Sequence, residues 1–302
     1  TAQKVFDRMK KRRFEPDLKS YTILLEGWGK DGNLLRVDEV FREMKEEGLV
    51  LDVVAYSILV HAYCKAKKFD KAIELFGEIE SRNLDPSPHV YCTLINGLGG
   101  ERRLSEALEF FERSKARGLA SEAPTYNAVV AAYCWSMRLQ DAFVVVDEMR
   151  NLRIGPNSRT YDIILHHLIK AGRKEEAYSV FCKMSGQDGC EPTASTYEIV
   201  LRMLYRERRM DTAIDTWNVM KSKGVVPGMH MFFVLIESLC RENMLDEACK
   251  YFQDMLDMGI RPTARLFSNL KQALLDRGHK ETALLLSQKI DKQRKAPLFQ
   301  VP

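Results

Sequence analysis

Hydrophobic residues in the stretch 54–79, "VAYSILVHAYCKAKKFDKAIELFGEI", fall into two helical stripes separated by a short polar segment. The first stripe has the spacing i, i+3, i+4, i+7 and i+8 and consists of Tyr56, Leu59, Val60, Tyr63 and Cys64. The polar segment "KAKKFD" interrupts it, and a second stripe follows at Ala72, Ile73, Phe76 and Ile79. This periodicity predicts a pair of amphipathic helices joined by a turn. No β-type alternation of useful length appears in the chain.

The helical pair recurs along the chain at an interval of 35 residues, with a single step of 36. An aromatic residue keeps this interval at Tyr21, Tyr56, Tyr91, Tyr126, Tyr161, Tyr197, Phe232 and Phe267. A small residue keeps it at Ala2, Val37, Ala72, Ala107, Ala142, Ala177, Ala213, Ala248 and Ala283. A proline stands five positions before most of the aromatic residues, at Pro16, Pro86, Pro156, Pro192, Pro227 and Pro262, and Pro297 continues the series. Three series with one shared period indicate a repeat protein.

Each repeat is expected to end near its proline, because proline cannot continue a helix. The expected units are 18–52, 53–87, 88–122, 123–157, 158–193, 194–228, 229–263 and 264–298. Residues 1–17 are expected to form the second helix of a truncated unit, and 299–302 a tail. The extra residue of 158–193 is expected in the Gly-rich turn "SGQDGC" at 185–190. Since each helical pair can bury its stripe only against its neighbours, the sequence predicts a stacked all-α solenoid.

Composition adds limits to this architecture. Of the 302 residues, 45% are hydrophobic and 29% are charged, which is typical of a folded, soluble protein. The net charge of +4 permits nucleic-acid binding where charge gathers on one face, but does not demand it. No apolar run approaches the roughly 18 residues that a membrane span needs, so no membrane partner is expected. The chain opens at Thr1 inside a helix-like pattern, and we therefore expect a fragment whose targeting segment was lost upstream.

Chemical groups typical of enzymes are missing from the sequence. The cysteines are odd in number, 7, and no pair has the C-x-x-C spacing, so we expect buried free thiols in a reducing compartment. No H-x-E with a downstream C-x-x-C, no P-loop and no G-x-S-x-G occurs. His166 and His167 are adjacent and would point about 100° apart on a helix, which is poor geometry for chelation. We expect no enzyme, no metal, no cofactor and no small-molecule substrate.

The motif of one unit, "Y-x-x-L-I…A-x-x-x-F-x-x-M…G-x-x-P", resembles the pentatricopeptide repeat (PPR) family. The segments "TYNAVVAAYC" (125–134) and "TLINGL" (93–98) are similar to its first helix, and "EALEFFE" (106–112) and "EACKYFQDMLDMGIRP" (247–262) to its second. The rival tetratricopeptide repeat has a W-x-x-L-G-x-x-Y pattern that is absent. Uniform units resemble the P class, and phrases such as "SYTILLEGWG" resemble plant mitochondrial members. The resemblance implies a right-handed superhelical α-solenoid.

In this family, the residue after the aromatic one and the last residue of the unit select an RNA base. By resemblance, the base-selecting pairs are Thr22 with Asp52, Ser57 with Ser87, Asn127 with Asn157, and Asp162 with Thr193. The first pair resembles a guanine reader and the third a pyrimidine reader. The remaining pairs are Cys92 with Glu122, Glu198 with Gly228, Phe233 with Thr263, and Ser268 with Leu298. Because Phe and Cys lack the expected amide or hydroxyl and Glu repels phosphate, this code is degraded.

Two further positions bear on RNA binding. The second residue of each unit, usually aliphatic in the family, is Val54 in one unit and otherwise Lys19, His89, Pro124, Arg159, Ser195, His230 and Arg265. These side chains are solvated at a helix start, contact phosphate or an acidic partner surface where they are basic, or have small structural roles. A basic residue ends the first helix at Lys30, Lys65, Lys170, Arg206 and Arg241. Contact with the RNA backbone and favourable interaction with the helix dipole are both open for these five.

The resemblance leads to two functional hypotheses. The first is an organellar protein that binds single-stranded RNA, mitochondrial or alternatively chloroplast, and acts by occupancy in transcript processing, stability, splicing or translation. The second is a scaffold subunit of an organellar ribosome or other ribonucleoprotein, with little base selectivity. The degraded code and the basic second positions give the scaffold hypothesis more support than the sequence of a regular family member would give it.

Overall fold

The computed structural model describes residues 2–188 and 190–295, and every regular element among them is an α-helix. Thr1, Gly189, Pro297, Leu298 and the expected tail 299–302 lie outside the described residues. The chain divides into two compact units, Thr1–Cys190 (unit 1) and Glu191–Pro302 (unit 2). Within each unit the predicted all-α solenoid of helical pairs is confirmed.

Unit 1 contains α1 to α11. Their bounds are α1 Ala2–Lys11, α2 Leu18–Asp31, α3 Leu34–Glu46, α4 Val53–Lys65, α5 Phe69–Ser81, α6 Pro88–Gly100, α7 Leu104–Ala116, α8 Ala123–Trp135, α9 Leu139–Asn151, α10 Ser158–Lys170 and α11 Lys174–Asp188. Unit 2 contains α12 Ala194–Arg206, α13 Met210–Ser222, α14 Met229–Arg241, α15 Leu245–Asp257, α16 Ala264–Asp276 and α17 Lys280–Lys295. The even-numbered helices from α2 to α10 in unit 1 and from α12 to α16 in unit 2 are first helices of repeats.

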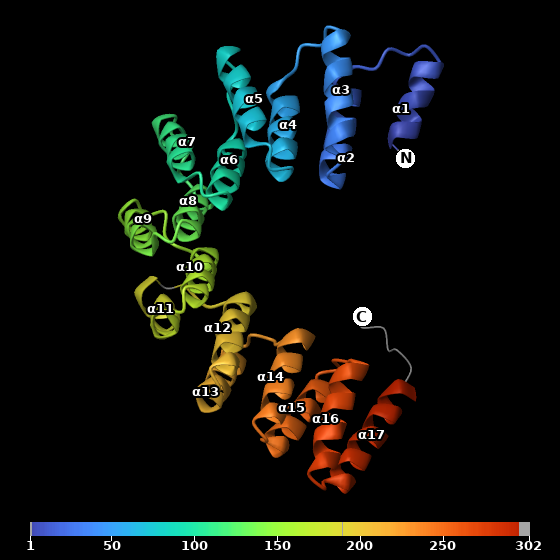
Figure 1. Ribbon diagram of the computed structural model, residues 1–302, viewed down its shortest axis with the longest axis vertical. Coiled ribbons are helices and arrows are strands. Elements are labelled where there is room, and N and C mark those ends of the chain that lie inside the picture. The colour runs from blue at the N-terminus through green and yellow to red at the C-terminus, as the bar shows by residue number, and fades with distance from the viewer. Residues whose placement is uncertain (1, 189, 296–302) are drawn as a thin grey trace. The chain divides into compact units, whose positions relative to one another are not determined.

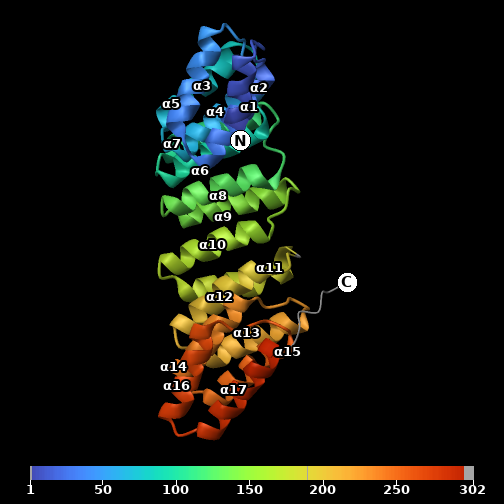
Figure 2. The same cartoon turned by 90° about the vertical axis from the view of Figure 1, so that its right-hand side faces the viewer.

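Within each unit, successive first helices pack against one another, and each also packs against the second helix of its own repeat. In unit 1 this produces a row of first helices with the second helices α5, α7, α9 and α11 on its outer side (Figure 1). Seen from the side, α8, α9 and α10 run next to one another along nearly the same direction (Figure 2). First helices begin at residues 18, 53, 88, 123, 158, 194, 229 and 264, which are the first residues of the expected units.

The prediction for residues 185–190 is wrong in its main point. We expected a turn there, but α11 continues to Asp188 and has 15 residues, two more than the 13 of α9. The extra length of this repeat is therefore helical as far as Asp188. The glycine at 186 has no neighbour within 4 Å that a Cβ would meet, so a close contact does not explain its presence.

The periodic aromatic residues form the contacts between repeats. The rings of Tyr21, Tyr56, Tyr91, Tyr126, Tyr197 and Phe232 are buried, and Phe267 is half-buried. Aromatic residues of second helices meet several of them edge-on, with ring centroids 5.1 Å apart for Phe111 and Tyr126 and 5.0 Å apart for Trp217 and Phe232. Such edge-to-face pairs add about 0.5–1.5 kcal/mol to the gain from burying the rings. The periodic alanines from Ala72 to Ala248 are buried as well.

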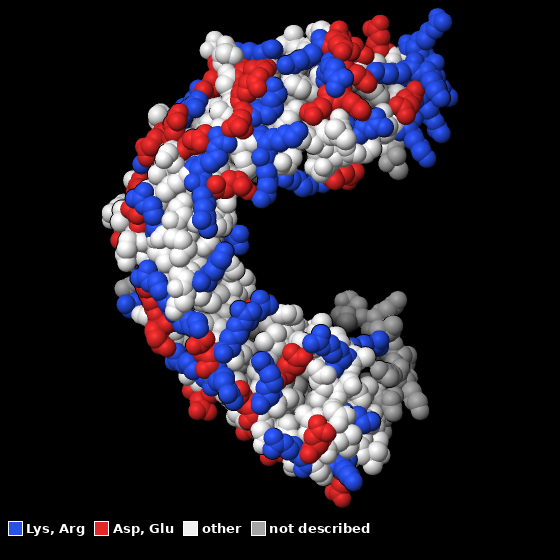
Figure 3. Space-filling view, in the orientation of Figure 1, with Lys and Arg blue, Asp and Glu red and all other residues white. Residues whose placement is uncertain are grey.

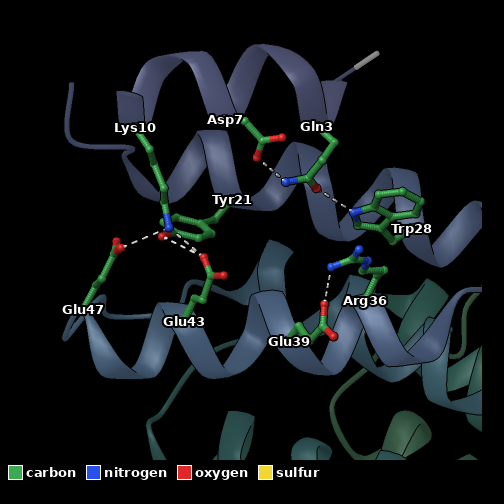
Figure 4. A network of polar contacts seen from close by, with 9 residues as sticks. All are labelled: Gln3, Asp7, Lys10, Tyr21, Trp28, Arg36, Glu39, Glu43 and Glu47. Carbon is green, nitrogen blue, oxygen red and sulfur yellow. Dashed lines mark hydrogen bonds and ion pairs between the residues drawn. The ribbon is translucent and has the colours of Figure 1, made fainter. Parts of the chain in front are cut away.

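Ion pairs join second helices of successive repeats at a spacing of 33 residues. These pairs are Lys10–Glu43, Lys45–Glu78, Arg113–Glu80, Lys115–Glu148 and Lys221–Asp254. In the first of them, Lys10 Nζ lies 2.7 Å from Glu43 and 3.5 Å from Glu47, beside the ring of Tyr21 (Figure 4). Because these groups are partly solvated, each pair contributes at most about 1 kcal/mol. These ion pairs lie on the second helices and do not involve the first helices, which can therefore serve another role.

The cysteine prediction holds only in part. Cys64 and Cys134 are buried and free, and burial raises the pKa of each thiol to about 12. Cys182, however, is exposed, and the other four are half-buried. Within the described residues, no helix combines the length and apolar character that crossing a bilayer requires.

Candidate nucleic-acid interface

The two predicted base-selecting positions of a repeat meet where neighbouring first helices begin. The residue after the aromatic one lies in the second turn of its first helix, for example Asn127 in α8. The last residue of the unit is the N-cap of the next first helix, for example Asn157 before α10. Since successive first helices are in contact, these positions form a row along the first-helix layer of each unit.

Helix capping gives the last residues a structural role of their own. An N-cap side chain that accepts a backbone N–H stabilises its helix by about 1 kcal/mol. Four of these last residues accept such a hydrogen bond, namely Asp52, Asn157, Thr193 and Thr263. Ser87 occupies the same position without a side-chain cap. The choice of residue at this position therefore reflects helix initiation as well as any RNA contact.

Asn127 and Asn157 are brought into direct contact. Asn127 Nδ2 donates a hydrogen bond to Asn157 Oδ1 at 3.3 Å. Asn127 is only 7% exposed, whereas Asn157 is exposed at the start of α10. Thr160 also takes part, because its hydroxyl donates to Asn127 Oδ1 at 2.6 Å. The sequence interpretation missed Thr160, although its spacing of 33 from Asn127 matches that of the ion pairs between repeats.

Thr22 and Ser57 are arranged differently. The Thr22 hydroxyl donates to the Leu18 carbonyl at 2.7 Å, and the Ser57 hydroxyl to the Val53 carbonyl at 2.6 Å. The side chain of Asp52 accepts from the Ala55 N–H at 2.8 Å. Thr22 and Asp52, the predicted guanine reader, therefore do not hydrogen-bond each other as Asn127 and Asn157 do.

The pair of Asp162 and Thr193 is divided between the two units. Asp162, in unit 1, is 7% exposed, and Thr193, in unit 2, caps α12 in a reciprocal capping box with Thr196. Of the positions that depart from the family pattern, Cys92 lies with its Sγ 3.3 Å from the Thr125 hydroxyl. Burial, the largest cause, raises the pKa of Cys92, so this thiol is held neutral.

Second residues of several units contact the preceding repeat, as the structural alternative for these positions allows. In unit 2, His230 Nδ1 lies 3.0 Å from Glu198 Oε1, and Arg265 stands over the Phe233 ring at 5.7 Å. In unit 1, the His89 ring faces that of His61 at 6.1 Å with an interplanar angle of 28°. Each of these side chains thus has a partner in the preceding repeat, while those of His230 and Arg265 remain 54% and 75% exposed.

The five basic residues predicted to meet the RNA backbone are all exposed, but they differ in their partners. Lys30 pairs with Glu26 at 2.6 Å, and Arg241 donates to the Ser238 hydroxyl at 2.9 Å. Lys65 donates to the Lys30 carbonyl at 2.6 Å, which places its charge at the C-terminus of α2. Within the described residues, Lys170 and Arg206 form no ion pair. These two are the best candidates for phosphate contact.

The charges that one face of the molecule displays are mostly mixed. Over α3 to α7, acidic and basic side chains alternate, whereas basic ones crowd the end of unit 1 that carries α1 (Figure 3). Exposed residues Lys11, Arg12 and Arg13 follow one another there. The small net charge is thus not spread evenly.

The adjacent histidines do not form a metal site with their neighbours. The His166 and His167 rings are nearly perpendicular, at 79°, and their centroids lie 5.4 Å apart. His167 is 7% exposed and meets the Trp135 ring edge-on. Burial, with the charges of His166 and Lys170 nearby, lowers the pKa of His167 to about 4. In the parts of the chain that the structure describes, no three His, Cys, Asp or Glu side chains gather to hold a metal ion.

Sequence comparison identifies the repeats. A sequence model described as "PPR repeat family" matches residues 20–65, 51–100, 121–170 and 160–206, and one described as "PPR repeat" matches 89–119, 195–225 and 234–260. Together these matches cover well over half of the chain. The chain belongs to the PPR repeat family. Its similarity to a PPR protein thus extends through both units.

Two PPR proteins of Arabidopsis thaliana are similar to parts of the chain. Pentatricopeptide repeat-containing protein At1g77360, mitochondrial, is 47% identical over 66 residues, which are 22% of this chain and 12% of that protein. Pentatricopeptide repeat-containing protein At1g71060, mitochondrial, is 63% identical over 42 residues, which are 14% of this chain and 8% of that protein. The matches therefore span only a small part of either relative.

Two solved PPR structures share the fold. The crystal structure of PPR10 from maize has a TM-score of 0.59 at 16% identity, covering 97% of this chain and 46% of that one. A structure of PPR10 in complex with an 18-nt psaJ RNA element has a TM-score of 0.64 at 20% identity, covering 97% of this chain and 43% of that one. At these identities the similarity shows the PPR fold.

Proposed function

We propose that the chain binds single-stranded RNA along its first helices, with about one base for each repeat. Repeats that read RNA in this way use two or three side chains per base. Membership of the PPR family and the fold shared with RNA-bound PPR10 support the proposal. Those comparisons concern the fold alone, so the proposal must also rest on a site within this chain.

The hydrogen-bonded pair of Asn127 and Asn157 carries the proposal. Its two members come from the two positions that the family uses for base selection, and they lie 3.3 Å apart, N to O. Asn157 is exposed at a helix start, where its amide can reach a base edge while Asn127 supports it from below. The amides of this pair have N–H groups that can donate to a base. We propose that this site reads a pyrimidine and that Thr22 with Asp52 reads guanine.

The proposed biological role follows from binding without chemistry. An RNA segment held along the first helices is shielded from nucleases or remodelled, which affects transcript processing, stability, splicing or translation. We place this activity in mitochondria, with the chloroplast as the alternative, because both Arabidopsis relatives have mitochondrial in their names. In this proposal the chain is no enzyme, and RNA is its partner.

Contacts in unit 2 favour a second candidate, a scaffold subunit of an organellar ribosome or other ribonucleoprotein. Glu198 is paired with His230 at 3.0 Å, and Glu237 with Arg265 at 3.6 Å. Asn269 also donates to Glu237 at 3.1 Å. These side chains already pair or hydrogen-bond with one another across repeats, so they are less available to select bases. Unit 2 would therefore bind RNA or protein with little sequence preference.

Selection from a randomised RNA pool tests the proposal. The full 302-residue chain should enrich RNAs with a guanine three positions before a pyrimidine, because repeats 18–52 and 123–157 are three apart. A chain carrying Asn127→Ala should lose the pyrimidine preference and keep the guanine. If no motif is enriched and the protein co-sediments with ribosomes, the scaffold candidate replaces the first.

The dependence of RNA affinity on salt is expected to report the phosphate contacts. If all five basic residues meet phosphates, the slope of log K against log [salt] should be about −3.5, at about 0.7 per contact on single strands. Lys170→Ala should reduce the slope by about 0.7 and leave base preference unchanged. Lys183→Ala, an exposed site on the second helix α11, is the matched control and should leave the slope unaltered. Equal slopes for both variants would remove Lys170 from the interface.

A further inference from the structure

We propose that Thr160 is a positioning residue that fixes which hydrogen-bonding group Asn127 turns toward an RNA base. This inference rests on the proposed RNA binding and adds a third residue, from the following repeat, to the base-selecting pair. Thr160 is the third residue of α10, and its side chain is 0% exposed. A buried hydroxyl at this place cannot itself touch RNA, so its influence must pass through Asn127 and Asn157.

Asn127, Asn157 and Thr160 are joined by a closed ring of hydrogen bonds. The backbone N–H of Thr160 donates to Asn157 Oδ1 at 3.1 Å, and this fixes the orientation of the Asn157 amide, since only the oxygen accepts. Asn127 must therefore turn its Nδ2 toward that oxygen. The Thr160 hydroxyl receives the backbone N–H of Asn157 at 3.0 Å. Its own proton points to the nearer of two acceptors, Asn127 Oδ1 at 2.6 Å, and Asn157 Oδ1 lies farther away at 3.2 Å.

This ring leaves donors, not acceptors, for a ligand. Both oxygens of the amide pair are engaged inside the ring, whereas the Nδ2 groups of Asn127 and Asn157 retain N–H bonds. Such donors suit a base with a carbonyl oxygen. Uracil and cytosine share the carbonyl at O2, and adenine has none. The ring thus gives a physical reason for preferring a pyrimidine to adenine at repeat 123–157, whereas guanine, with its carbonyl at O6, is not distinguished by it.

Three other repeats of unit 1, those that contain Thr22, Ser57 and Cys92, can be compared in the same way. Thr22 and Ser57 satisfy their hydroxyls on their own helices, and the third residue of the following repeat is apolar, Ala55 or Val90. Cys92 and Asn127 do not return to their own helices. They are followed at a spacing of 33 by Thr125 and Thr160, which contact them. A buried threonine therefore occurs where the base-selecting side chain needs an external partner.

Removal of the Thr160 hydroxyl should free the Asn127 amide to rotate. In Thr160→Val, Asn127 Oδ1 and the Asn157 N–H lose their partner, and only the bond from Asn127 Nδ2 to Asn157 Oδ1 still orients the Asn127 amide, which then rotates more readily. Because one hydrogen bond contributes about 1 kcal/mol, the preference for a pyrimidine over adenine at this site should fall about fivefold. The guanine three positions earlier should be unaffected.

The test repeats the randomised selection with the full chain and three variants. Thr160→Val should lose the pyrimidine and keep the guanine, and Thr160→Ser, which restores the hydroxyl, should recover it. Thr125→Val removes the equivalent hydroxyl one repeat earlier and should retain the pyrimidine. Helical circular dichroism at the selection temperature checks folding, and Thr160→Ala replaces the valine variant if that one unfolds.

The outcomes separate this inference from the proposed function. An unchanged pyrimidine preference in folded Thr160→Val overturns the inference while RNA binding stands. Loss of both guanine and pyrimidine in Thr160→Val, with no recovery in Thr160→Ser, also overturns it, because a purely structural role would act in this way. A wild-type chain that enriches no motif overturns the proposed function and the inference together.

Discussion

Replacement of Gly99 by alanine is expected to lower the free energy of unfolding by about 2–3 kcal/mol, the cost typical of an overpacked core. A Cβ on Gly99 would stand 2.6 Å from Ala132 Cβ and 2.8 Å from Ala132 Cα. The second contact is with backbone, so a change of rotamer cannot relieve it. Helices α6 and α8 would have to move apart, which would disturb packing along the row of first helices in unit 1.

The neighbouring Gly100 provides a matched control. Its added Cβ would meet nothing within 4 Å, and alanine is favoured over glycine in a helix by up to about 1 kcal/mol. Urea unfolding followed by circular dichroism should therefore move the midpoint down for Gly99→Ala and leave it unchanged or raised for Gly100→Ala. Equal midpoints for the two variants would contradict the close approach of α6 and α8.

The second large effect concerns pH. His167 has its pKa lowered to about 4 by burial, with smaller contributions from His166 and Lys170, whereas an unfolded histidine titrates near about 6.5. Above pH 6.5, His167 is neutral in both the folded and the unfolded chain, so its protonation does not affect stability. As the pH falls from about 6.5 to about 4, only the unfolded chain gains the proton, so about 2–3 kcal/mol of stability is lost. Below pH 4 this loss stops growing.

Unfolding at pH 7.5, 5.5 and 4.5 measures this loss. Carboxylates also titrate in the acid range, so the informative quantity is the difference between variants. His167→Gln should be less sensitive to acid than the wild-type chain by about 2–3 kcal/mol at pH 4.5. His166→Gln, which changes an exposed histidine on the same helix, removes only a smaller contribution and should stay much closer to the wild-type curve than His167→Gln does. Identical curves for all three chains would show that His167 is not a buried neutral group.

The helical repeats could be predicted from the sequence because three positions report the same period. The buried ring of Tyr126 and the buried Ala142 recur because packing between repeats needs them, and Pro156 marks the interval between α9 and α10. These features depend on interactions within a helix or between adjacent helices, so they can be recognised in a single sequence. The sequence did not predict that α11 continues to Asp188. Gly186 indicated a turn there, but the residue lies inside the helix.

The candidate site could be predicted only as a set of positions. Whether Thr22 turns its hydroxyl to the Leu18 carbonyl or toward a ligand depends on the rotamer of its side chain. That rotamer cannot be deduced from the sequence. The contact of His230 with Glu198 depends on how two repeats stack. A search for polar pairs 32 or 33 residues apart would have found that contact and the one between Asn127 and Thr160.

The row of first helices as the RNA-binding surface is the central claim, and photo-crosslinking tests it most directly. RNA carrying 4-thiouridine would be irradiated with the full chain, and the crosslinked peptides identified by mass spectrometry. Crosslinks should map to first helices, above all to the peptide of α8 that contains Asn127 and to Asn157 before α10. Crosslinks confined to second helices such as α5, α7 and α9, or none above those of a denatured control, would contradict the account.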